Sequence, residues 1–280
     1  MSTTHQHWYF ILEDFLCRDV TVETDRLPAI SGLAALFQKR LNEEMGSVEY
    51  VAGLWSNALM EGLEWQSLRS KAEEDIFPDQ KPLPGEEGYI APTWSPASYL
   101  GVSAHGATMH GYVDIAQVTG YHTTPKTMDN PFGELIDGWV SIRGPMIKLH
   151  LSDLPDEYEA RIGAFSRNMR LCTPNGHDLG SYSSFDGITG QTRETRAWVE
   201  KSEVFAFFTT ERKFNEDGTK RGPPMIFRSL LVTPVSEKRR VVPGRNEYMR
   251  LGTFFLNEDD LADDKGIVRD VEGFTEIVLV

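Results

Sequence analysis

The residues best suited to chemistry lie close together in one part of the sequence. His105, His110, Asp114 and His122 follow one another in a predicted strand region. Imidazole and carboxylate groups can transfer protons or bind metal ions. Residues 110 and 114 share one face of a regular strand, whereas His105 and His110 point to opposite faces. This spacing does not favour a metal site, and surface or hydrogen-bonded side chains are the simpler interpretation. If the chain is an enzyme, we expect His110 or Asp114 to move a proton.

Two arginines interrupt apolar strand sequences. Arg143 follows Ile142, and Arg228 follows Phe227. A guanidinium group at an apolar surface needs an anionic or carbonyl partner, so either arginine could polarise a substrate oxygen. An internal salt bridge with one of the 42 acidic residues is the simpler interpretation for each.

Aromatic side chains are frequent in and beside the predicted strands, and four are candidates for substrate binding: Trp94, Tyr121, Trp139 and Phe207. A barrel of about eight strands can be filled by its own side chains or can hold one small ligand. If it is hollow, its apolar and aromatic lining suits a small molecule. If it is filled, these residues are core.

Several functional classes lose their usual support. The sequence has no G-x-G-x-x-G motif, no phosphate-binding loop and no G-x-S-x-G motif, so we expect no nucleotide or redox cofactor. The formal net charge of −14 repels a phosphate backbone and an anionic membrane, so nucleic acid is not expected as a partner. With two cysteines, no glycosylation sequon and no apolar run near the roughly 20 residues of a membrane span, the predicted location is the cytoplasm.

The chain is expected to form one unit, with a helical section over 6–76, a linker over 77–90 and a β-rich section over 91–280. Apolar residues spaced by three and four predict a helix from Leu27 to Leu41, which Asp25 can cap. Two more helices are predicted over 8–17 and 54–68. Proline, glycine and charge mark the linker.

After the linker the pattern changes to alternating and β-branched runs. Strands are predicted within 107–124, 139–151, 197–214, 225–234, 248–257 and 275–280. The region 154–200 has weak periodicity and is either a binding loop or an insertion. The fold class is therefore α+β and mainly β, with N-terminal helices packed on an antiparallel, barrel-like sheet.

Short segments also match one family in order and spacing: Asp25-Arg26-Leu27-Pro28-Ala29, Tyr50-Val51-Ala52-Gly53-Leu54-Trp55, Gly62-Leu63-Glu64-Trp65, Ala91-Pro92-Thr93-Trp94-Ser95 and Tyr248-Met249-Arg250-Leu251-Gly252. The chain resembles the C-terminal region of fungal heterokaryon-incompatibility (HET) proteins along nearly its whole length. Pro96 stands where that family usually has a second tryptophan. The N-terminal HET domain is missing, so we expect a stand-alone relative whose role does not depend on that domain.

Orphan proteins of this kind occur in fungal secondary metabolism, where some act as cyclases or pericyclases, and the resemblance implies such a role only by analogy. Elimination of cofactor, metal and covalent nucleophile leaves catalysis by enclosure, orientation and proton transfer. We therefore expect a cofactor-independent enzyme that binds an apolar small molecule and catalyses a cyclisation, a pericyclic (Diels-Alder type) step, an isomerisation or a dehydration. The alternative is a non-catalytic HET-like interaction or ligand-sensing protein. The sequence allows a homodimer.

Overall fold

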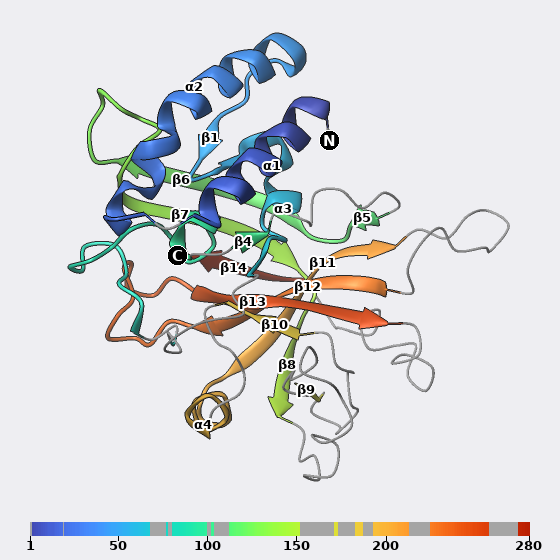
Figure 1. Cartoon of the computed structure of the whole chain (residues 1–280). Helices are drawn as coiled ribbons and strands as arrows, with labels where there is room; N and C mark the ends of the chain where they lie inside the picture. Colours follow the sequence, from blue (N-terminus) through green and yellow to red (C-terminus); the bar gives the residue numbers. More distant parts are fainter. Residues whose placement is uncertain are drawn as a thin grey trace, which may run out of the picture.

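The computed structural model describes residues 2–18, 20–67, 77, 80–99, 102–103, 112–151, 171–172, 183–186, 193–212, 225–257 and 274–280. These residues form a mixed α+β structure in which helices pack on a large sheet (Figure 1). This agrees with the predicted fold class in its coarse form.

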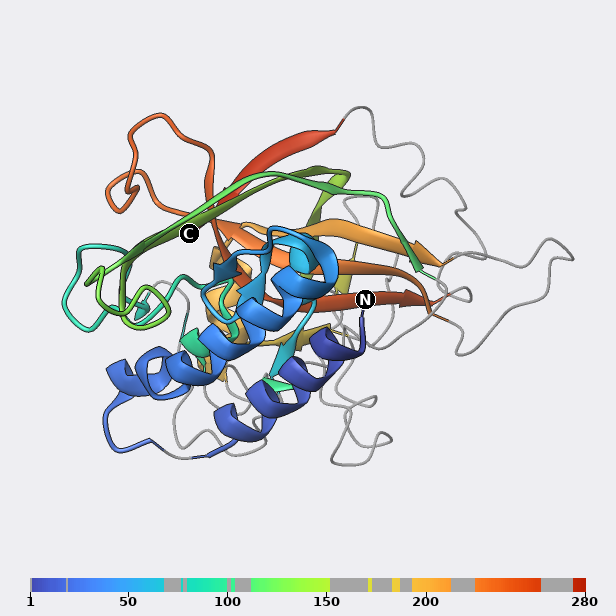
Figure 2. The same ribbon diagram turned by 90° about the horizontal axis from the view of Figure 1, so that it is seen from above.

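Two helices make up most of the N-terminal section. Helix α1 (Thr3–Leu16) is capped by Ser2, whose hydroxyl accepts a hydrogen bond from the His5 amide. Helix α2 (Arg26–Met45) follows the short helix η1 (Glu23–Asp25) and ends at Gly46, whose φ of 89° favours glycine. The helices predicted over 8–17 and from Leu27 to Leu41 are confirmed as α1 and α2, each longer than predicted. The two helices lie side by side across the sheet (Figure 2). Among the helices that the structure describes, none has the length and apolar character to cross a membrane.

The helix predicted over 54–68 is wrong. This segment contains strand β2 (Leu54–Trp55), which pairs with β1 (Tyr50–Val51), and the helices η2 (Ser56–Ala58) and α3 (Leu59–Gly62). It also contains strand β3 (Gln66–Ser67), which pairs with β4 (Val102–Ser103). Ala52 and Gly53 have φ of 50° and 96° and form a tight turn between β1 and β2. All residues from Val51 to Trp55 are buried, so their apolar character reflects a buried hairpin and not one face of a helix.

The large sheet has ten strands: β5 (Tyr112–Asp114), β6 (Gln117–Pro125), β7 (Leu135–Gly144), β8 (Met146–Leu151), β9 (Leu171–Cys172), β10 (Ser183–Phe185), β11 (Val204–Arg212), β12 (Met225–Pro234), β13 (Glu247–Asn257) and β14 (Thr275–Leu279). The main order is β6-β7-β14-β13-β12-β11-β8-β9, while β10 pairs with β13 and β5 with β11. All pairs are antiparallel except β13 with β14. The predicted strand 197–214 begins too early, because helix α4 (Arg193–Lys201) precedes β11.

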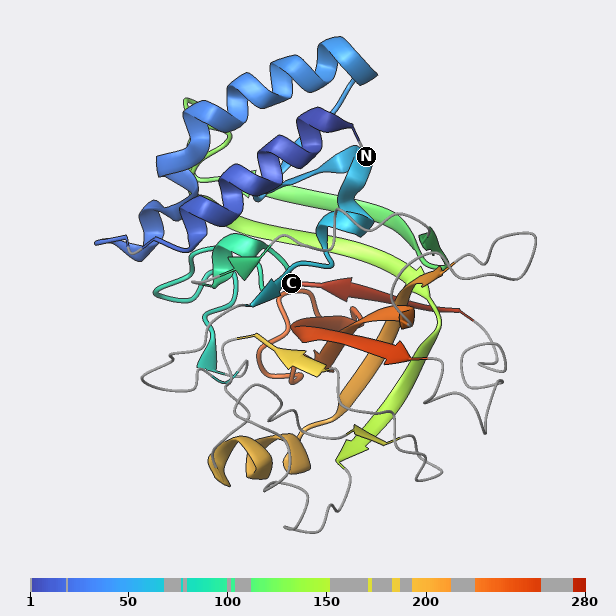
Figure 3. The same ribbon diagram turned by 45° about the vertical axis from the view of Figure 1, so that its right-hand side comes forward.

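Strands β7 and β8 form one continuous segment that bends at Pro145 (Figure 3). Strand β7 pairs with β14, while β8 pairs with β11. The strands β14, β13, β12 and β11 therefore connect the two halves of this bent segment. Gly144 at the bend is required by close packing, since a Cβ atom there would lie 2.6 Å from the Ala116 Cβ and 3.0 Å from the Phe207 ring. Among the described strands, β6 and β9 at the two ends are not paired with each other, and the predicted barrel is not confirmed.

Side chains fill both sides of the sheet. Phe207 points towards the N-terminal helices and its neighbours Ala206 and Phe208 point the other way, as expected for a strand buried on both faces. The core under α1 and α2 contains Trp8, Trp55, Trp65, Trp94, Val140, Ile142, Leu230 and Ile277. The second core, beside α4, contains Leu149, Val199, Phe208, Leu231, Leu251 and Phe254. Within the part of the chain that the structure describes, the space between the helices and the sheet is therefore a packed interior.

Candidate functional site

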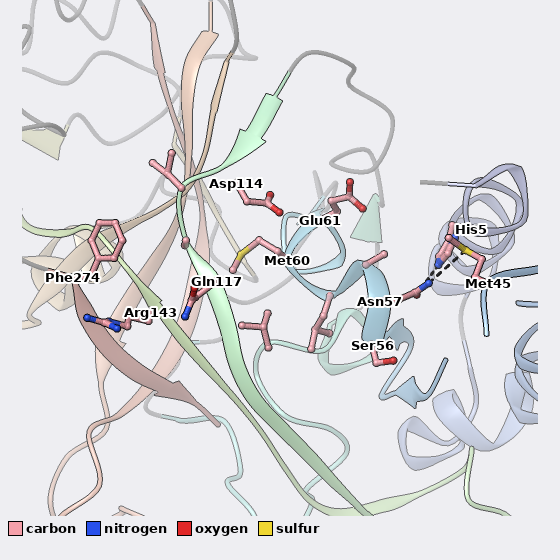
Figure 4. Close-up of a pocket in the computed structure, with 15 residues that line it drawn as sticks. His5, Met45, Ser56, Asn57, Met60, Glu61, Asp114, Gln117, Arg143 and Phe274 are labelled. Atoms are coloured by element: carbon pink, nitrogen blue, oxygen red, sulfur yellow. Dashed lines mark hydrogen bonds between the residues drawn. The ribbon is translucent and has the colours of Figure 1, made fainter. Parts of the chain in front are cut away.

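A groove of about 600 Å³ lies between the N-terminal section and one end of the sheet (Figure 4). One wall is formed by η2 and α3, from Ser56 to Glu61, and the other by the segment from Asp114 to Val118. Arg143 comes from β7 and Phe274 directly precedes β14, while His5 and Met45 come from α1 and α2. The volume is in the range of small-molecule sites, so this groove is the best candidate that the described residues offer.

Two carboxyl groups from different elements lie in this groove. Glu61 belongs to α3 and Asp114 to β5, and Figure 4 shows both side chains near Met60. Burial raises the pKa of Glu61, and the negative charges of Asp114 and Glu64 raise it further. Loss of hydration also raises the pKa of Asp114, although that side chain remains exposed. Carboxyl groups with raised pKa values hold protons closer to neutral pH, where they can act as general acids as well as bases.

At another part of the groove, His5 holds Asn57 in place. The His5 ring is buried, with its Nε2 atom 2.9 Å from Asn57 Oδ1 and its Nδ1 atom 2.9 Å from the Ser2 hydroxyl. Because an amide oxygen only accepts, Nε2 donates in this arrangement. Burial lowers the pKa of His5, and the bond to Asn57 opposes that shift. The His5 ring therefore orients the amide of Asn57, whose Nδ2 donates to the Met45 sulfur at 3.5 Å.

Arg143 lies at the groove beside Gln117, its partner in the pairing of β6 with β7. On the other side it pairs with Glu276 of β14. Glu276 accepts hydrogen bonds from Thr119 and Ser141, and these bonds lower its pKa, with a smaller contribution from the charge of Arg143. Among the described residues, no carboxylate forms an ion pair with Arg143, so its charge is available to a ligand.

Of the two interpretations of Arg228, the structure favours the internal salt bridge over a contact with substrate. Its side chain is buried and forms an internal salt bridge, with Nη1 at 2.6 Å from Glu64 Oε2. The other oxygen of Glu64 accepts from the hydroxyls of Thr209 at 2.6 Å and Thr210 at 3.1 Å. Glu64 therefore connects the segment after α3 to the sheet, and this clamp fixes the wall that carries Glu61.

None of the four predicted aromatic contacts lines the groove. Trp94 and Phe207 have no exposed surface and belong to the core, because the interior is filled. Tyr121 donates a hydrogen bond to Glu49 at 3.0 Å, and Trp139 is covered by Arg245, whose guanidinium carbon is 4.3 Å from the ring centroid. His110 lies outside the described residues, as does most of the region 154–200.

The groove contains functional groups that sequence reasoning missed. His5 and Glu61 lie far from Asp114 in the sequence, and no motif spacing connects the three residues. Glu61 stands in a short apolar segment, where a single carboxylate is typical of a solvated face. Only the fold brings Glu61 and Asp114 to the same groove.

The segments that carry the HET resemblance contact one another through hydrogen bonds. Arg250 donates to the carbonyl of Leu63 at 2.5 Å and to that of Trp65, and its guanidinium carbon lies 3.4 Å from the Trp65 ring centroid. The Trp65 indole in turn donates to the carbonyl of Trp94 at 2.9 Å. Arg250 is also paired with the buried Asp186, at 2.8 Å. These motif side chains hold the N-terminal section on the sheet.

The remaining motif contacts are of the same kind. The Ser95 hydroxyl donates to the carbonyl of Ala52 at 2.6 Å, which joins the segment 91–98 to the turn between β1 and β2. Arg26 at the start of α2 donates to the carbonyl of Ala97 at 3.1 Å. These segments therefore make packing contacts, and the groove lies beside them.

No family model, curated protein or solved structure matches the chain. The resemblance to HET proteins stays a prediction, and the case for a function rests on the geometry of the groove.

Proposed function

We propose that the chain is a cofactor-independent enzyme that isomerises or dehydrates a small molecule by proton transfer in the groove. The observation that carries this proposal is the presence of two carboxyl groups with raised pKa values, Glu61 and Asp114, in one groove of small-molecule size. Arg143 and Gln117 add a cation and an amide to the same groove. A cytoplasmic location and a role in fungal secondary metabolism are part of the proposal, and they depend on composition and on the resemblance.

The two carboxyl groups supply complementary steps. The charge of Asp114 raises the pKa of Glu61 further, so Glu61 can donate a proton while Asp114 accepts one. In an isomerisation, the base removes a proton from one carbon and the acid returns a proton to another. In a dehydration, the base removes a proton from the carbon next to the one that carries the hydroxyl, the acid protonates the departing hydroxyl, and water leaves as the carbon–carbon double bond forms. Neither reaction needs an oxidant, a reductant or a cofactor.

This groove supports proton transfer better than a pericyclic reaction. Pericyclic catalysis depends mainly on enclosing and orienting an apolar substrate. The aromatic residues suited to that role, Trp94 and Phe207, are fully buried in the core. The groove instead combines apolar atoms of Met60 and Phe274 with ionisable groups.

The test is incubation of the purified protein with small-molecule extract of its source organism, followed by mass spectrometry. The wild-type chain should convert one compound to an isomer or to a product lighter by one water. The double variant Glu61→Gln, Asp114→Asn should be at least about 100-fold slower, which is the usual contribution of acid-base catalysis. A matched double variant at exposed positions outside the groove, Glu87→Gln, Asp129→Asn, should keep wild-type activity. Identical extracts before and after incubation would contradict the proposal.

A second candidate function is ligand sensing or protein interaction without catalysis. It is favoured by the packing role of the motif segments, since none of the motif contacts described above requires chemistry in the groove. Under this hypothesis a compound from the extract binds and is recovered unchanged. The same mass-spectrometric experiment therefore separates the two candidates.

A further inference from the structure

Arg143 lies in the middle of a row of three polar side chains that crosses the sheet. Gln117 on β6 is its direct partner on one side, and Glu276 on β14 is its direct partner on the other. Residues directly opposite each other in antiparallel strands have their Cβ atoms about 5 Å apart and point to the same face. A cation is thus placed between an amide and a carboxylate, and the cation and the amide both line the groove.

The carboxylate in this row is held by two hydroxyls and not by an ion pair with the cation, although the charge of Arg143 contributes to lowering its pKa. Glu276 Oε1 accepts hydrogen bonds from Thr119 at 2.6 Å and Ser141 at 3.0 Å, and no ion pair joins it to Arg143. The buried strand arginines behave differently, since Arg228 is paired with Glu64 and Arg250 with Asp186. Within the part of the chain that the structure describes, Arg143 is the groove residue whose positive charge is available to an anion.

The groove is apolar next to this cation and acidic further along. Figure 4 shows Phe274 and Gln117 near Arg143, with Asp114 and Glu61 beyond Met60. The Phe274 side chain is 57% exposed although it is large and apolar, so a ligand could cover it. An elongated ligand that begins at Arg143 and Phe274 would therefore pass Met60 before it meets the carboxyl groups.

We propose that Arg143 and Gln117 bind the carboxylate of an organic acid, whose apolar part packs on Phe274 and Met60 and whose reacting carbon reaches Asp114 and Glu61. This inference rests on the proposed function and names its substrate class. The planar guanidinium group can hold a carboxylate by two parallel hydrogen bonds, which fixes the direction of the rest of the molecule. A second negative charge at the far end would meet Glu61 and Asp114, so a monocarboxylate is favoured over a dicarboxylate.

Binding of hydrocinnamate, cinnamate and phenylpyruvate, each compared with its carboxamide, tests the inference by calorimetry or by changes in the protein NMR spectrum. At least one acid should bind the wild-type protein more tightly than its amide. Arg143→Gln should weaken binding of that acid by about ten-fold or more, the usual effect of losing a charge-assisted hydrogen bond. Arg245→Gln makes the same charge change on an arginine that lies before β13 and covers Trp139 outside the groove, and it should leave binding unchanged.

Three outcomes would overturn the inference: equal binding of acids and amides, equal loss in the two arginine variants, or no binding of any of the acids at millimolar concentration. The binding is measured without turnover, so it also separates this inference from the proposed function. The double variant Glu61→Gln, Asp114→Asn should bind the acid at least as tightly as the wild type, because it removes negative charge from the groove. If the acid binds and no conversion is found with any extract, the proposed function fails and the carboxylate site stands.

Discussion

Arg143 and Arg228 have similar surroundings in the sequence but different places in the structure. Each follows an apolar strand residue, yet Arg228 is buried against Glu64 and Arg143 is exposed in the groove. The difference comes from a distant segment, since Glu64 is 164 positions away from Arg228. The comparison teaches that a charged residue within an apolar strand is structural where the fold supplies a buried partner, and is available for binding where it does not.

Removing Arg228 should have the largest effect on stability. Arg228→Ala leaves the Glu64 carboxylate buried without its cation, which typically costs about 3–5 kcal/mol. The free energy of unfolding, measured by urea denaturation, should fall by that amount. Arg143→Ala in the same assay should change it by less than about 0.5 kcal/mol, because that side chain has no ion pair to lose.

A double variant tests whether the cost comes from the unpaired charge. Glu64→Leu with Arg228→Met replaces both charges by apolar side chains of similar size and should recover most of the lost stability. If Arg143→Ala destabilises the protein as much as Arg228→Ala does, Arg143 also has a structural role and is not simply available for binding in the groove.

Gly144 sharpens the comparison because it is the next residue after Arg143 and faces the core. Gly144→Ala places a Cβ atom 2.6 Å from Ala116 Cβ and 3.0 Å from the Phe207 ring, so the packed core must shift. Overpacking of this kind costs about 1–3 kcal/mol, which thermal and urea unfolding can measure.

Gly32→Ala is the control for that substitution. Gly32 lies within α2, and an added Cβ atom there meets no heavy atom within 4 Å. This variant should be stabilised by up to about 1 kcal/mol, because alanine is the better helix former. Equal effects at the two glycines would mean that the bend at Pro145 is less tightly packed than the structure shows.

Regular parts of the fold could be predicted from the sequence. The three-and-four spacing of apolar residues predicted α2, and the β-branched run from Met225 to Pro234 predicted β12 at its observed bounds. The segment after Val51 was misread because every residue of the hairpin is buried, which hides any periodicity. The sequence could not predict whether the interior is filled, because the packing joins residues that are distant in the sequence. The approach of Phe207 to Gly144 is an example.

The groove could be predicted only in part. Asp114 and Arg143 were chosen from their local sequence, and both line the groove, although their roles there stay predictions. Glu61 and His5 carry no local signal, because each gains its environment from a segment distant in the sequence. Arg228 could not be distinguished from Arg143 for the same reason.

The smallest predicted effect is a dependence of stability on pH, which distinguishes Glu61 from Glu64, the carboxylate paired with Arg228 in the clamp. Burial raises the pKa of Glu61 in the folded protein above its ordinary value of 4.5. The folded state therefore binds more protons than the unfolded state between pH 4.5 and the raised pKa, and stability contributed by this residue falls as pH rises through that window. Glu61→Gln has no charge to bury, so it should be slightly more stable than the wild type at neutral pH. The difference should vanish near about pH 3, where the carboxyl is protonated in both states.

Urea unfolding across this pH range measures the difference, and Glu87→Gln, at an exposed position outside the groove, corrects for the general loss of one negative charge. A gain in stability that is the same at all pH values would show that Glu61 is not held in a protonation-sensitive environment. A loss of stability at neutral pH would show that its carboxylate is satisfied by the fold, as Glu64 is. Either result would remove the feature that distinguishes the groove from the clamp, and with it the argument that Glu61 is free to exchange a proton with a substrate.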